Sequence, residues 1–235
     1  KVNQLREALE RAVDGRGKRF VCVSGPVGCG KSTAVRVLAR DLGLRVREWE
    51  SETLPPSTFG TTDHATPVPY RSQLDDLADF LRAAPYRSLS LAASTSALAP
   101  TPQSSPPTLE PHHHHHHHRG ELVLIESLPF TPRTPQAARA HAVLAAAAEQ
   151  AYRRPDARVV FVFIASGSGE SGPSPLELKE MLGAALVDSI KLFSEVPFNP
   201  VPPGRLAKAV SAWLAARGVR ASEGQAKAIA EGSGG

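Results

Sequence analysis

The chain has 235 residues, 41% of them hydrophobic, and its 27 basic and 23 acidic side chains give a formal charge of +4. This length and composition predict one sizeable α/β core and the start of a second unit. No apolar run is long enough for a membrane span and the N-terminus has no signal-peptide pattern, so we expect no membrane partner. Two cysteines give no disulfide framework and favour a reducing compartment. The small positive charge permits contact with nucleic acid without predicting it.

The first predicted elements are a helix, a strand and a second helix. An amphipathic pattern predicts a helix over residues 3–13. The apolar, β-favouring run from Phe20 to Val23 predicts a buried strand that ends at Ser24. After a glycine-rich loop, apolar residues at helical spacing predict a helix, namely Val35, Leu38, Ala39 and Leu42.

The loop between this strand and helix carries the strongest motif of the chain. Gly25, Gly30, Lys31 and Ser32 match G-x-x-x-x-G-K-[ST] in the strand–loop–helix context that the motif requires. Glycines let backbone N–H groups converge on phosphates, while the Lys31 ammonium reaches the outer phosphates and the Ser32 hydroxyl binds Mg²⁺. The alternative is an ordinary glycine-rich turn before a core helix. We therefore predict that the cofactors are ATP and Mg²⁺, with a binding loop formed by Gly25, Pro26, Val27, Gly28, Cys29, Gly30, Lys31, Ser32 and Thr33.

Further along the chain, the composition changes sharply. The pattern predicts a strand at Leu44–Trp49 and a helix at about Gln73–Ala84. Residues 92–119 are rich in Ala, Ser, Thr and Pro and end in the run His112–His118. Such a segment buries too little apolar surface to offset the entropy of ordering it, so we expect a disordered insertion. The histidine run could bind a transition metal or be a purification tag, but no function is assigned to it because metal sites have defined ligand spacing.

The next strand is predicted to carry the metal-side acid. Residues Glu121–Ser127 contain four apolar residues followed by Glu126, and P-loop proteins need a carboxylate at the tip of a neighbouring strand to hold Mg²⁺. An exposed glutamate at a strand end is the alternative. We therefore predict that Glu126 is a metal and catalytic residue, together with Ser32 as the second metal-side residue.

A helix at 135–152 and the strongest strand of the chain, Arg158–Ser166, follow. A polar side chain at the end of this strand can reach the outer phosphate or the attacking water, so Ser166 is the second catalytic candidate; a simple turn-initiating serine is the alternative. Gly167, Gly169 and Gly172 then form G-x-G-x-x-G, a dinucleotide fingerprint. Because Ser-Pro-Ser-Pro follows, the helix does not open at the loop, and a flexible loop is the better interpretation.

The last part of the chain completes an alternating pattern of strands and helices. It predicts a helix, a short strand and two closing helices, at Pro175–Leu186, Ile190–Phe193, Arg205–Arg217 and Ser222–Glu231. Such alternation predicts a parallel sheet covered on both faces. We expect a nucleotide-binding core over residues 1–200 and, after the proline-rich connector PFNPVPP, the start of a helical lid over 204–235.

Several segments resemble one family as an ordered set: GPVGCGKST, LGLRVREWE, PYRSQLDDLADFLRAAPYRSL, VLIESLP, FVFIAS, FNPVPP and AEGSGG. Together they resemble the AAA+ region of the Rad17 family, the large subunits of the checkpoint clamp loader related to replication factor C. The resemblance implies a P-loop NTPase fold of AAA+ type and a nuclear ATP-binding protein of the DNA-damage checkpoint. It also implies four small replication factor C subunits, a heterotrimeric sliding clamp and primed DNA as partners. By position, Gly25–Thr33 is the phosphate loop, Glu126 the acidic strand end and Ser166 the first sensor.

The sequence departs from the family where hydrolysis is concerned. An acid pair is expected at the strand end, but Ser127 follows Glu126, so we expect weak ATP hydrolysis. The adenine-holding segment and the second sensor are expected outside this sequence. Two other hypotheses stay open: a P-loop kinase acting on a small molecule, and a scaffold that needs nucleotide only to keep its shape.

Overall fold

A computed structural model describes residues 1–50, 72–84, 118–167, 172–219 and part of 222–228. Its centre is a five-stranded sheet in the order β2-β3-β4-β1-β5, in which every neighbouring pair is parallel. The strands are β1 (Phe20–Gly25), β2 (Leu44–Trp49), β3 (Gly120–Ile125), β4 (Val159–Ser166) and β5 (Phe193–Pro197). This architecture confirms the predicted α/β fold.

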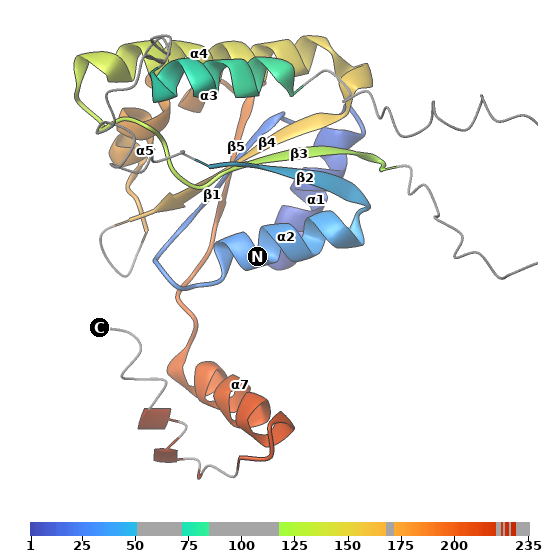
Figure 1. Ribbon diagram of the computed structural model, residues 1–235, viewed down its shortest axis with the longest axis vertical. Helices are drawn as coiled ribbons and strands as arrows, with labels where there is room; N and C mark the ends of the chain where they lie inside the picture. Colours follow the sequence, from blue (N-terminus) through green and yellow to red (C-terminus); the bar gives the residue numbers. More distant parts are fainter. Residues whose placement is uncertain are drawn as a thin grey trace, which may run out of the picture.

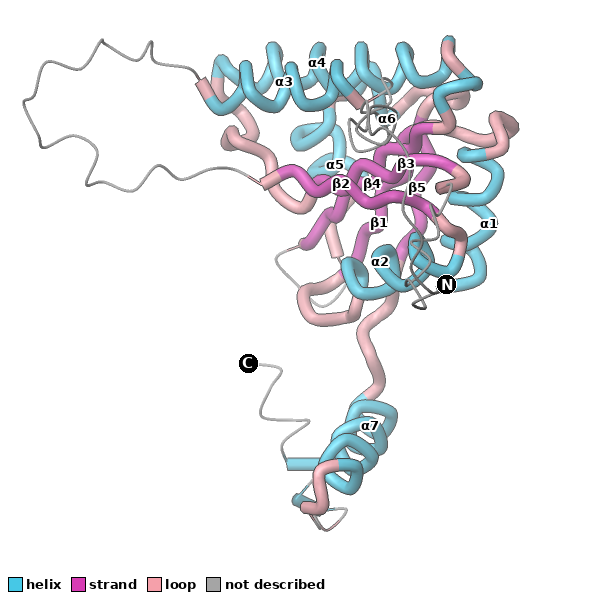
Figure 2. The backbone as a smooth tube through the Cα atoms, turned by 45° about the vertical axis from the view of Figure 1, so that its right-hand side comes forward, coloured by secondary structure: helices cyan, strands magenta, loops and turns pink. Residues whose placement is uncertain are grey.

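Helices cover both faces of the sheet (Figure 1). One face is covered by α1 (Val2–Val13) and α2 (Lys31–Asp41), and the other by α3 (Gln73–Ala83), α4 (Pro135–Arg153), α5 (Pro175–Leu182) and α6 (Ala184–Val187). The tube in Figure 2 shows the strands between these two layers. Each layer has its own core, because alternate strand residues point to opposite faces: Val21 and Val23 pack toward α1 and α2, whereas Phe20 and Cys22 pack toward the other layer.

Two predicted elements have different bounds in the structure. The strand expected at Ile190–Phe193 is β5, which starts only at Phe193, because residues 190–192 form a turn in which Leu192 donates its backbone N–H to the Ser189 hydroxyl. The helix expected at Pro175–Leu186 is divided into α5 and α6 by Gly183, which has a φ of 86°. A Cβ at this glycine would lie 2.7 Å from the Cβ of His141 on α4, so tertiary packing breaks the helix.

The turn after α1 is built tightly. Gly15 has a φ of 80°, and its N–H and that of Arg16 bond to the carbonyls of Ala12 and Arg11, which is a Schellman helix end. The buried guanidinium of Arg19 donates to the carbonyls of Ala12 and Val159, and burial lowers the pKa of Arg19. These bonds fix the turn to both α1 and the beginning of β4.

The chain continues beyond the sheet into α7 (Pro203–Ala216), which lies apart from the two layers (Figure 1). The second predicted closing helix, Ser222–Glu231, falls largely outside the described residues, so the expected lid remains a prediction. Most of the expected insertion, including His112–His117, also lies outside them. Its boundary was wrong at one end, because Arg119 donates its backbone N–H to Gly43 and pairs with Asp14 at 2.6 Å. Within the described ranges, no helix is both long and apolar enough to cross a membrane.

Candidate nucleotide-binding site

The P-loop joins the end of β1 to the start of α2. Three of its glycines, Gly25, Gly28 and Gly30, have φ values of 150°, 77° and 87°, which other residues rarely adopt. Nothing lies within 4 Å of a Cβ built at Gly28 or Gly30, so the backbone conformation alone requires glycine there. Glycine-dependent turns of this kind form the concave backbone nests that bind anions.

Lys31 is buried inside this loop, with 5% of its surface exposed. Its Nζ donates to the carbonyl oxygens of Gly25 and Pro26, at 2.9 and 2.6 Å. Both acceptors are neutral, and no carboxylate of the described residues pairs with this ammonium. The ammonium also lies 3.9 Å from the Cys29 Sγ. A buried cation without a carboxylate partner is stabilised by an anion, so the loop fits the phosphates of a nucleotide.

The start of α2 is also suited to phosphate. Its N-cap is Gly30, which supplies no side-chain capping bond to the first backbone N–H groups of the helix. The positive end of the helix dipole therefore remains available to an anion. In the first turn, Ser32 is half-buried and Thr33 is exposed, whereas Val27 in the loop is 79% exposed.

The structure places both predicted strand-end residues on the same edge of the sheet as the P-loop. Ser166, the last residue of β4, lies directly opposite Gly25 in the parallel register and is exposed. Glu126 follows the last residue of β3, the next strand beyond β4, and is exposed as well. Ser166 is therefore adjacent to the loop, while Glu126 lies one strand further away.

Glu126 contacts α2 through a residue that the sequence analysis missed. The Arg36 Nη2 lies 3.1 Å from Glu126 Oε1, and the same guanidinium binds Glu48 at 2.7 and 2.9 Å. The hydrogen bonds from Arg36 hold the pKa of the Glu48 carboxyl below its usual range. Only a partial signal was present in the sequence: Arg36 follows Ser32 by four residues, so both lie on one face of α2, but this spacing does not identify Glu48 or Glu126 as partners.

The base of the P-loop is packed against two segments that follow it in sequence. The Ser24 hydroxyl donates to Glu195 on β5, and the Phe198 N–H donates to the Ser24 carbonyl at 2.7 Å. A Cβ at Gly172 would lie 2.7 Å from the Cα of Gly25. Gly172 of the G-x-G-x-x-G stretch therefore packs closely against the P-loop. Residues 168–171 of the stretch lie outside the described part of the chain.

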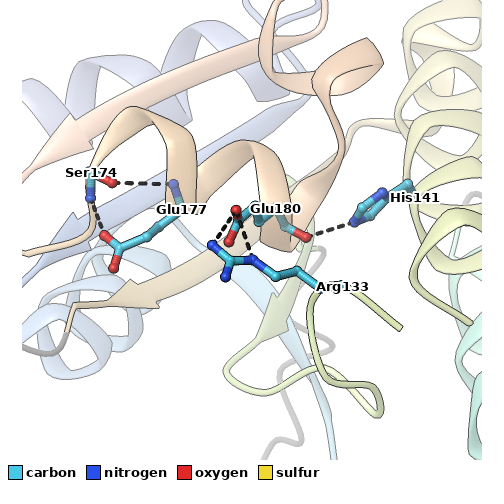
Figure 3. A network of polar contacts seen from close by, with 5 residues as sticks. All are labelled: Arg133, His141, Ser174, Glu177 and Glu180. Atoms are coloured by element: carbon cyan, nitrogen blue, oxygen red, sulfur yellow. Dashed lines mark hydrogen bonds and ion pairs between the residues drawn. The ribbon is translucent and has the colours of Figure 1, made fainter. Parts of the chain in front are cut away.

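The helix after this stretch, α5, begins at Pro175, three residues after Gly172, so it does not open at the glycine loop as a dinucleotide fingerprint requires. The Ser174 hydroxyl accepts from the Glu177 N–H while the Glu177 carboxylate accepts from the Ser174 N–H (Figure 3). The bond from the Ser174 backbone N–H to the carboxylate lowers the pKa of Glu177. Glu180 on the same helix binds Arg133 at 2.7 Å, and its carbonyl bonds to His141 Nε2 at 2.9 Å (Figure 3). These contacts join α5 to α4 and to the segment that follows Glu126.

Ser127 is exposed beside Glu126, so the strand tip carries one carboxylate where two were expected. Among the described residues, no group of three histidine, cysteine or acidic side chains is arranged to hold a metal ion. A magnesium ion at this site would therefore depend on nucleotide phosphates for most of its ligands, which is how Mg²⁺ is usually bound beside a P-loop.

Comparisons with known proteins agree with this geometry. A sequence profile of the AAA ATPase domain matches residues 1–165. The cell cycle checkpoint protein RAD17 of Mus musculus is 33% identical over 84 residues, and that of Homo sapiens is 32% identical over 93 residues. These matches cover 32% and 36% of this chain but only 12% and 14% of the relatives. The checkpoint protein rad17 of Schizosaccharomyces pombe is 53% identical over 36 residues, which are 15% of this chain and 6% of that protein.

The chain thus matches a small part of much longer checkpoint proteins. The family profile spans the P-loop, its flanking strand and helix, and Glu126 after β3, and it ends one residue before Ser166. The predicted resemblance to the Rad17 family is confirmed over the matched stretches. The chain belongs to the AAA ATPase domain family.

Proposed function

We propose that this domain binds ATP with Mg²⁺ and serves as the nucleotide-binding part of a checkpoint clamp-loader subunit. The observation that supports ATP binding best is the buried Lys31, which points into the glycine loop without a carboxylate partner among the described residues. In this proposal the phosphates bind to the loop backbone and the first turn of α2, while the Lys31 ammonium compensates their charge.

Three residues have separate roles around the phosphates in this proposal. The Ser32 hydroxyl and the Glu126 carboxylate hold the metal side, and Ser166, opposite Gly25, is placed to contact the outer phosphate. Bound Mg²⁺ would neutralise charge on the phosphate oxygens. Because Glu126 is paired with Arg36 at 3.1 Å, it has to leave or share this partner when it turns toward the metal.

The role in clamp loading is proposed from the similarity to RAD17 checkpoint proteins. The partners would be small replication factor C subunits, a heterotrimeric checkpoint clamp and primed DNA reached through the assembled complex. The location would be the nucleus, where such a complex acts on DNA. Ser127 in place of a second acid suggests that nucleotide serves mainly as a signal for assembly and shape.

Reconstitution tests this proposal. The protein that contains this domain should co-purify with the small replication factor C subunits, and primed DNA together with the clamp should raise ATP turnover of the complex. A Lys31→Ala variant should assemble poorly, whereas Arg40→Ala, which removes an equal charge at the far end of α2, should assemble normally. Transfer of phosphate to a free metabolite would instead support the kinase hypothesis, and unchanged assembly without nucleotide would contradict a nucleotide-dependent role.

A further inference from the structure

A hollow lies at the edge of the sheet opposite the P-loop. It has a volume of about 550 Å³ and is lined by Arg16, Lys18, Tyr152, Ile190 and Lys191 among others; we call it the basic hollow. Phe20 and Phe193, which open β1 and β5, pair in register beside it. Since β1 has six residues, the hollow and the P-loop are separated by about 20 Å, the length of a strand. The basic hollow is therefore distinct from the nucleotide site.

The basic hollow has an unbalanced charge. Arg16, Lys18 and Lys191 form no ion pair with any described residue, and no acidic side chain of the described chain is among its lining residues. A fourth cation, Arg11, also lines the hollow but is already paired with Glu7 at 2.5 Å. Three unpaired cations around one concavity favour a ligand that brings negative charge.

The turn that carries two of these cations is held in place before any ligand binds. Arg16 is the last residue of the Schellman turn after α1, and Lys18 follows it, next to the buried Arg19 that anchors this turn to β4. A Cβ at Gly17 would lie 2.7 Å from the backbone nitrogen of Ala12, so the turn is packed directly on α1. Because the backbone of this turn is already ordered, a ligand can bind here with little further loss of backbone conformational entropy.

Apolar surface in the hollow indicates what kind of anion fits. Ile190 is 85% exposed and Tyr152 is 46% exposed, and both lie among the cations. The adjoining surface that shares Arg16 has mixed charge, because it contains Asp14 and Asp156 together with Arg119 and Arg158, and Asp14 is paired with Arg119. It therefore does not extend the positive charge of the hollow along a continuous phosphate backbone. A protein segment can bring a few carboxylates to the cations and one apolar side chain to Tyr152 and Ile190. It therefore matches this combination of charged and apolar surface better than nucleic acid does.

We propose that the basic hollow docks an acidic segment of a partner protein. Its carboxylates bind Arg16, Lys18 and Lys191, and one leucine or phenylalanine side chain packs on Tyr152 and Ile190. This surface leaves the P-loop free, so the docked segment and the nucleotide can be bound together.

Fluorescence anisotropy with the full chain tests the proposal. The probe is a labelled peptide made of Asp, Glu, Leu and Phe, at physiological ionic strength. Combined Arg16→Ala, Lys18→Ala and Lys191→Ala changes should weaken peptide binding about tenfold or more, since three charge pairs are lost. Ile190→Ser should weaken it without any change of charge, because the apolar contact is lost.

A control variant removes the same charge elsewhere. Arg40→Ala, Arg205→Ala and Lys208→Ala together should leave peptide binding within about twofold of the wild type, and ATP affinity should be unchanged in both triple variants. Thermal melting of each variant checks that the fold is intact. Equal weakening by the control triple, absence of peptide binding, or a thymidine oligonucleotide that binds this hollow more tightly than the peptide would overturn the proposal.

Discussion

Ser127 follows Glu126 at the end of β3, where the wider family has a second acid that deprotonates the attacking water. A serine hydroxyl has no ionised form at neutral pH with which to accept that proton. General bases contribute about 10²- to 10⁴-fold to rate, so Ser127→Glu should raise single-turnover ATP hydrolysis at least about tenfold. ATP affinity should change little, because the phosphate loop, Ser32 and Glu126 are untouched.

This comparison belongs in the assembled complex with the sites of neighbouring subunits disabled. Ser127→Gln is the matched control, since it adds a side chain of similar length without a titratable carboxylate. If the wild-type site hydrolyses ATP as fast as Ser127→Glu, another residue supplies the base.

A substitution at Gly172 tests how tightly the chain packs against the P-loop. Its φ of 75° is nearly the same as the 76° of Gly218, so Ala at either position meets the same backbone strain. Only at Gly172 would the added Cβ meet the backbone of Gly25, at 2.7 Å, whereas nothing lies within 4 Å at Gly218. Gly172→Ala should therefore lower the free energy of unfolding by about 1–3 kcal/mol more than Gly218→Ala, and should also weaken ATP binding. Urea unfolding measures the difference, and equal losses in the two variants would show that this contact is not tight.

Arg36 connects three elements, since it lies on α2 and binds Glu48 on β2 and Glu126 after β3. The pKa of Glu48 is lower in the folded than in the unfolded chain, so its ionised carboxylate stabilises the fold. This contribution is fully present above the unfolded pKa and is lost as the pH falls through the folded pKa. The pair is largely exposed, so we expect about 0.5–1 kcal/mol at neutral pH.

Urea unfolding of Glu48→Gln checks this expectation. The variant should be less stable than the wild type at pH 7 and equally stable once the pH is below the folded pKa of Glu48. Glu50→Gln, which removes the same charge two residues away, should show no such pH-dependent difference. If the free energy of unfolding of Glu48→Gln stays equally far below that of the wild type in acid, the substitution acts through packing and not through the ion pair.

Most elements were predictable because their patterns are local. The P-loop motif and the apolar runs of β1, β3 and β4 fixed the sheet, and their strand ends placed Glu126 and Ser166. The break at Gly183 was not predictable, because it depends on His141 of α4, which is distant in sequence. Likewise, the Arg36 contacts depend on how α2 lies over β2 and β3, and the packing of Gly172 on Gly25 depends on the path of the chain after β4.

We expect the insertion to contribute little to the stability of the whole domain. Doubling the length of a flexible loop adds only about 0.6 kcal/mol of closure entropy. Replacing residues 92–117 with a short Gly/Ser linker, while retaining Arg119 and its contact with Asp14, should leave the melting temperature and ATP affinity nearly unchanged. A second variant, Arg119→Ala, shows how much the retained contact contributes. A fall of many degrees with the linker would mean that the replaced segment packs against the domain.

The central claim is that the P-loop binds nucleotide through Lys31, and isothermal titration of MgATP into the full chain tests it most directly. Charge-assisted bonds to phosphate are the strong kind, so Lys31→Ala should lose about 2 kcal/mol or more, about thirtyfold in affinity. Lys18→Ala should bind ATP like the wild type, and melting curves should show that both variants are folded. Equal ATP affinity in the wild type and in Lys31→Ala would contradict the assignment of this loop as the nucleotide site.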